Sequence, residues 1–75
     1  MKFIEMTGRV LAKIVSDDEL HKDDLHAAGV TDDTVVRVNE QGDIEVRRPD
    51  GWDVVGGLLG NYEERVKQTT GLDFV

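Results

Sequence analysis

Residues 34–48 decide the fold of this chain, and they read TVVRVNEQGDIEVRR. On each side of the central NEQG, apolar and polar residues alternate with the period of a strand that has one buried face. Gly42 stands where a type I turn with a G1 bulge needs a residue at positive φ. The segment therefore predicts a β-hairpin over 34–48 whose apolar face is formed by four side chains: Val36, Val38, Ile44 and Val46.

Residues 17–28, which precede the hairpin, are predicted to form a helix. Ser16 and Glu19 have the spacing of a capping box, in which each side chain bonds a backbone N–H at the helix start. Gly29 suits the left-handed position that ends a helix, and Val30 would then pack back onto the last turn in a Schellman motif. The buried stripe of this helix would be narrow: Leu20, Leu25 and Ala28.

Residues 3–15 fit two periodicities equally well. The alternation of a strand is carried by Ile4, Met6, Val10, Ala12 and Ile14. A helical face fits as well, and it is formed by Phe3, Met6, Thr7, Val10, Leu11 and Ile14. We favour a strand, because a two-stranded hairpin alone is marginally stable and a third strand would stabilise the sheet.

Residues 52–70 also allow two interpretations. Apolar residues that recur at helical spacing share one arc of ~140°. These residues are Val54, Val55, Leu58, Leu59, Tyr62 and Val66. The pattern favours one helix over 53–70, although glycines on its opposite side cost about 1 kcal/mol each relative to alanine. The alternative is a strand at 52–55 followed by a short helix over 61–70.

These segments predict an α+β fold in a single domain over residues 1–75. The preferred order is β-α-β-β-α, a three-stranded sheet with two helices packed on one face. If residues 3–15 were helical, the order would be α-α-β-β-α. The chain has no cysteine for a disulfide or a thiolate metal site that would support so small a core. Homodimer formation is therefore one expected way to cover its apolar surface.

The formal net charge of −7 comes from nine basic and sixteen acidic residues, and most of the excess lies in residues 16–33. An acidic field repels phosphate backbones, so the charge disfavours nucleic acid as a partner. No apolar stretch approaches the ~20 residues needed to cross a bilayer. The first residues lack the apolar core of a signal peptide. We expect a small acidic cytoplasmic protein without a membrane partner.

The sequence predicts no catalytic residues, no cofactor and no metal site. His21 and His26 are five residues apart on the expected helix, so their rings point ~140° away from each other rather than toward one metal ion. Ser16 is used as a helix cap and lies in no nucleophile motif. The carboxylates gather at helix starts and turns, where water solvates them. We therefore expect a protein that is not an enzyme.

Three arginines at the hairpin are the first candidates for binding. Arg37 and Arg47 would lie on the outward face of neighbouring strands, with Arg48 at the end of the second strand. Together they could bind a carboxylate or a phosphate. We favour the alternative, in which the arginines pair across the strands with Glu45 and Asp43.

Three glycines are the second group of candidates. Gly56, Gly57 and Gly60 would form a side-chain-free face on a 53–70 helix, onto which a partner chain could dock. A turn between a strand and a helix explains these glycines as well. Trp52 beside them would anchor the contact. We expect a protein–protein interaction or regulatory module, whose partner is another protein or a second copy. The alternative is a nucleic-acid-associated regulator with the arginines on a winged-type hairpin.

Overall fold

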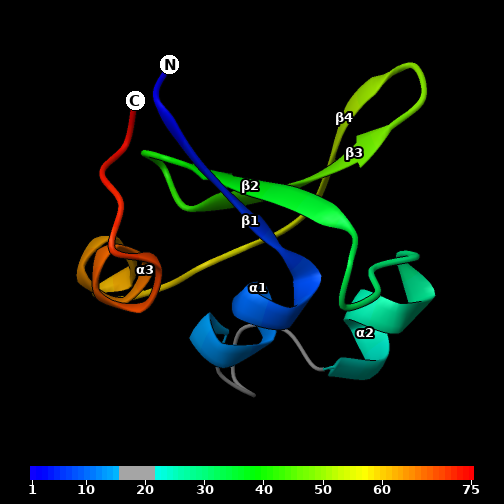
Figure 1. Ribbon diagram of the computed structural model, residues 1–75, viewed down its shortest axis with the longest axis horizontal. Coiled ribbons are helices and arrows are strands. Elements are labelled where there is room, and N and C mark those ends of the chain that lie inside the picture. Colours follow the sequence, from blue (N-terminus) through cyan, green and yellow to red (C-terminus); the bar gives the residue numbers. More distant parts are fainter. Residues whose placement is uncertain (16–21) are drawn as a thin grey trace.

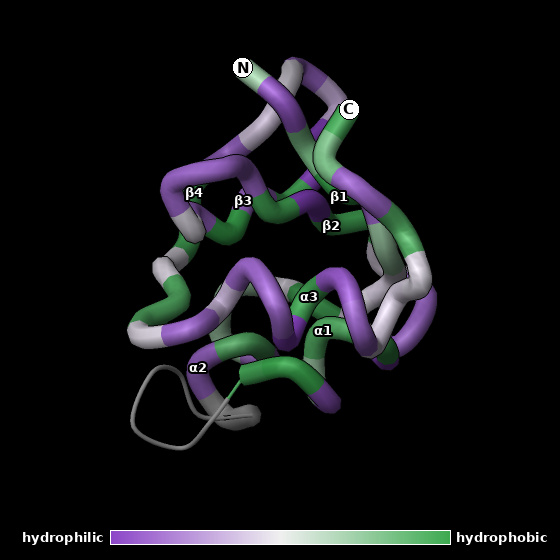
Figure 2. The backbone as a smooth tube through the Cα atoms, turned by 90° about the vertical axis from the view of Figure 1, so that its left-hand side faces the viewer, coloured by the Kyte–Doolittle hydropathy of each residue, from purple (hydrophilic) through white to green (hydrophobic). Residues whose placement is uncertain are grey.

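The computed structural model of the chain describes residues 1–15 and 22–75. Its elements in chain order are β1 (Phe3–Thr7), α1 (Gly8–Ile14), α2 (Lys22–Ala27), β2 (Val35–Asn39), β3 (Asp43–Arg48), β4 (Gly51–Gly57) and α3 (Tyr62–Thr70). The strands form one antiparallel sheet in the order β1-β2-β3-β4. Figures 1 and 2 show α1, α2 and α3 on the same side of this sheet. The α+β class is confirmed, but the sheet has four strands rather than three.

The β2–β3 hairpin has the predicted register and buried face. Val36 pairs with Val46 and Val38 with Ile44, and all four side chains are fully buried. Gly42 closes the turn at φ +86°, as its position predicted. The buried Asn39 holds the turn, because its Oδ1 accepts the backbone N–H of Gln41 at 2.9 Å and that of Asp43 at 3.0 Å.

The N-terminal segment contains both a strand and a helix, so the prediction of one strand over 3–15 is wrong. β1 pairs with β2 from Phe3 opposite Asn39 to Thr7 opposite Val35. α1 then begins at Gly8, after the N-cap Thr7, whose Oγ1 accepts the N–H of Val10 at 3.4 Å. The backbone N–H of Gly8 donates to Thr34 O at 2.9 Å. Leu11 and Ile14 on α1 are buried beneath the sheet.

The C-terminal part differs from the preferred prediction of one helix over 53–70. Residues 51–57 are β4, and α3 covers only Tyr62–Thr70. This is the alternative interpretation, with a longer strand than the expected 52–55. Gly60 at φ +67° separates the two elements, and such a backbone conformation does not continue a helix. α3 ends at Gly71, whose N–H donates to Lys67 O at 2.8 Å.

α2 ends as the sequence of its last turn indicates. Gly29 has a φ of +80°, and its N–H donates to His26 O at 2.9 Å. The N–H of Val30 donates to Leu25 O at 2.9 Å, which completes a Schellman motif. Leu25 and Val30 are both buried. The predicted capping box of Ser16 and Glu19 lies outside the described residues, as do the first residues of the predicted 17–28 helix.

The core lies between the sheet and the helices, and every element contributes to it except β4, whose Val55 packs against its margin. Its buried residues are Ile4, Met6, Leu11, Ile14, Leu25, Val30, Val36, Val38, Ile44, Val46, Leu58 and Val66. The side chain of Arg65 links α3 to α1 and to the loop before α3. It donates to Ile14 O at 2.8 Å and to Leu59 O at 2.7 Å. None of the described helices is long and apolar enough to cross a membrane.

Substitution of Gly8 tests the close contact between α1 and the loop before β2. A Cβ at Gly8 would overlap the carbonyl oxygen of Thr31 and lie 2.8 Å from Val30 Cγ1. We expect Gly8→Ala to lower the free energy of unfolding by about 1–3 kcal/mol, measured by urea denaturation. In the control Gly57→Ala, the new Cβ would lie 3.8 Å from its nearest neighbour, Gly42 O. Equal stability of the two variants would contradict this account.

Candidate functional site

The face of the sheet opposite the helices is called the outer face, and no described helix covers it. Its side chains alternate along the strands with those of the core. They are Phe3, Glu5 and Thr7 of β1, Val35, Arg37 and Asn39 of β2, Asp43, Glu45 and Arg47 of β3, and Trp52 and Val54 of β4. This face is the candidate functional site because it combines aromatic, aliphatic and charged side chains that the core does not use.

Arg37 is at the centre of the outer face. Its guanidinium carbon lies 3.7 Å from the ring centroid of Phe3 and 4.0 Å from that of Trp52. Its Nη2 donates to Oε1 of Glu45 at 3.0 Å. The side chains of Arg37 and Glu45 are only 19% and 11% exposed. One arginine thereby fixes two aromatic rings and neutralises a largely buried carboxylate.

Apolar side chains lie beside the cluster that Phe3, Arg37, Glu45 and Trp52 form. The exposed fraction is 59% for Val54 and 37% for Val35, and Trp52 is partly exposed. Both valines are β-branched residues of the kind that pack well against another sheet surface. The outer face therefore offers a fixed aromatic centre with aliphatic contacts beside it.

The structure separates the three predicted arginines. Arg37 and Arg47 lie on the outer face, as expected, and Arg47 is exposed. Arg48 instead donates to Ala28 O at 2.7 Å and lies 3.4 Å from Oδ2 of Asp53. It therefore bonds the carbonyl end of α2, a structural role. The three do not form one patch, and Arg37 makes the cross-strand pair that we favoured.

The predicted glycine face of a helix does not exist, because Gly56 and Gly57 belong to β4 and Gly60 to the loop after it. Trp52, in contrast, lies on the outer face beside Arg37. β4 is an end strand of the sheet, with a bulge where Glu45 pairs with Val54 and Ile44 with Gly56. A bulge bends an end strand and makes further strand pairing less favourable. The side chains of the face are thus better placed for binding than the edge.

Phe3, Glu5 and Val54 are members of the outer face that the sequence did not single out as site residues. Finding them requires the register of β1 and β4 against the central hairpin. The alternation within β1 does put Phe3 and Glu5 opposite to Ile4 in the sequence. However, this signal has no meaning until the segment is known to be a strand.

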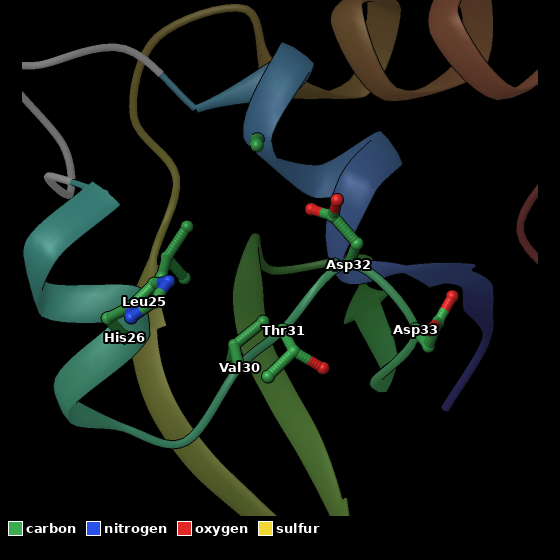
Figure 3. Close-up of a pocket in the computed structure, with 8 residues that line it drawn as sticks. Leu25, His26, Val30, Thr31, Asp32 and Asp33 are labelled. Carbon is green, nitrogen blue, oxygen red and sulfur yellow. The ribbon is translucent and has the colours of Figure 1, made fainter.

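A hollow of about 510 Å³ lies on the helix side, between α1, α2 and the loop before β2. Figure 3 shows His26 on α2 and Asp32 beside α1, on separate sides of this hollow. Asp32 lies 3.6 Å from Arg9, and both side chains are largely exposed. Within the described part of the chain, no group of three or more His, Asp and Glu side chains could hold a metal ion.

Comparisons with protein-family models, with curated proteins and with solved structures found no match to this chain.

Removal of Arg37 tests whether the cluster is one interacting unit. Arg37→Leu would leave the carboxylate of Glu45 without its partner, so we expect a loss of about 2 kcal/mol in the free energy of unfolding. The double variant Arg37→Leu/Glu45→Leu should recover part of that loss. Urea denaturation followed by Trp52 fluorescence measures both effects.

The control for this series is Arg9→Leu. The Arg9–Asp32 pair is 3.6 Å long, and its side chains are 67% and 71% exposed. Its removal should change stability by less than about 0.5 kcal/mol. If Arg37→Leu were as mild as Arg9→Leu, the cluster would not be a coupled unit.

Proposed function

We propose that this chain is a non-enzymatic protein–protein interaction module of the cytoplasm and that its binding surface is the outer face. The observation that carries the proposal is the position of the Phe3–Arg37–Trp52 stack on a sheet face without a covering helix among the described residues. Tryptophan and arginine are the residue types that most often dominate the energy of protein interfaces. Here they are already in contact on one face.

The fixed geometry of the stack also supports binding. A side chain that is ordered before a partner arrives loses less conformational entropy when the complex forms. Arg37 is held by Glu45 at 3.0 Å and lies over both rings, so the aromatic groups are positioned in advance. Val54 and Val35 add apolar area that a partner could bury.

The alternative proposal of a nucleic-acid-associated regulator has less support. Arg37 and Arg48 are used in contacts within the chain, at 3.0 Å to Glu45 and 2.7 Å to Ala28 O. Arg47 alone of the three is left for a phosphate, on a chain of net charge −7. Binding to a duplex needs several phosphate contacts.

Capture experiments with matched variants test the proposed surface. Val54→Lys places a charge on the outer face, whereas Leu59→Lys places it on the loop before α3, and these side chains are 59% and 64% exposed. We expect immobilised wild type and immobilised Leu59→Lys to retain the same polypeptides from a mixture that also contains added copies of the chain itself. Val54→Lys should lose them, because the lysine must be desolvated in the complex.

The comparison is made by quantitative mass spectrometry of the retained polypeptides, after circular dichroism has shown that each variant is folded. Retention by Val54→Lys at wild-type levels would contradict the proposal that the outer face is the binding surface.

A further inference from the structure

Two exposed charges of opposite sign lie on different strands of the outer face. Glu5 is on β1 and Arg47 is on β3, with β2 between these strands. Within residues 1–15 and 22–75, neither side chain forms an ion pair. Arg37 and Glu45 of the same face are already paired with each other. The two outer charges are therefore available to a partner.

Each of these charges has an aromatic neighbour on the same face. Phe3 lies two residues before Glu5 on β1, and Trp52 is the register partner of Arg47. Residues two apart on one strand are about 7 Å apart, and register partners on neighbouring strands are about 5 Å apart. The face thus carries Glu5 beside Phe3 at β1 and Arg47 beside Trp52 at β3 and β4, and the two pairs have similar spacing.

We propose that the outer face binds the outer face of a second copy of this chain. A two-fold axis that sets Glu5 over Arg47 of the other copy also brings Phe3 near Trp52 of that copy. The symmetry repeats both contacts, as in any isologous interface. This inference rests on the proposed function and names the partner of its surface. Two sheets packed face to face in this way would lie about 10 Å apart.

The distribution of charge favours this face over the helix layer for contact between identical chains. The outer face carries three acids, Glu5, Asp43 and Glu45, against the two bases Arg37 and Arg47, so it is close to neutral although the whole chain has a net charge of −7. Among the described residues, the helix side exposes more acids than bases: Asp24, Asp32, Asp33, Glu63 and Glu64 against Arg9, Lys13 and Lys67. Contact through the helix layer would bring together two surfaces of net negative charge, whereas contact through the outer face can pair Glu5 with Arg47.

Charge reversal at the two positions tests the proposed pair. Sedimentation equilibrium of the full chain should show a dimer for wild type. Glu5→Arg and Arg47→Glu should each raise the dimer dissociation constant by about tenfold or more, because like charges would meet at two symmetric places. The double variant Glu5→Arg/Arg47→Glu should return it to within about threefold of wild type.

The control Glu64→Arg makes the same change in net charge as Glu5→Arg, but on α3. Either change reduces the repulsion between two acidic chains, so repulsion alone predicts tighter association for both. The interface predicts weaker association for Glu5→Arg only. Circular dichroism confirms that each variant is folded, which is expected because these side chains are exposed.

Three results would overturn the inference: a monomeric wild type, a dimer that neither reversal weakens, or a double variant that stays as weak as the single variants. A monomeric wild type would leave the loss of capture by Val54→Lys intact, so the inference and the proposed function can fail separately.

Discussion

The alternation of residues in the β2–β3 hairpin is the constraint on which the rest of the structure depends. Because Val36, Val38, Ile44 and Val46 are fully buried on one side of the hairpin, the helices must cover that side. The same alternation places Arg37 and its neighbours on the other side. One periodicity thus determines both the location of the core and the residues left for binding.

The hairpin is held in place by contacts that are distant in sequence. Tyr62 of α3 donates its hydroxyl to Glu40 O at 2.8 Å, and the N–H of Leu58 donates to Gly42 O at 2.8 Å. On the other side, α1 bonds the loop before β2 through Gly8 and Arg9. These contacts position the strands on either side of the hairpin, so that Phe3 and Trp52 both reach Arg37. The outer face therefore depends on the packing of the helix layer.

The sequence predicted those features that a few neighbouring residues determine. The hairpin, its turn at Gly42 and the αL end of α2 at Gly29 all follow from local conformational preferences. The Arg37–Glu45 pair followed from the hairpin register. Where the chain changes from one element to another under the influence of distant groups, local patterns were insufficient.

Two boundaries illustrate this limit. At the change from β1 to α1, Thr7 caps the helix locally, and the distant carbonyl groups of Thr34 and Asp32 accept the N–H groups of Gly8 and Arg9. In β4, the bulge after Val54 breaks the alternation of a strand, so the apolar residues imitate a helical period. The energetic cost of glycine within a helix was the signal against the 53–70 helix. The outer face could not be predicted in full because it depends on the register of both misassigned segments.

Isotope-filtered nuclear Overhauser spectroscopy on an equal mixture of ¹³C-labelled and unlabelled chain tests the central claim most directly. The claim is that the outer face, rather than the helix layer, binds a second copy of this chain. Cross-peaks between the Phe3 ring of one copy and the Trp52 ring of the other are the predicted result. Intermolecular cross-peaks confined to α1, α2 or α3 would contradict it. The absence of intermolecular cross-peaks at concentrations up to about 1 mM would also contradict it, because the affinity would then be too weak for a specific interface.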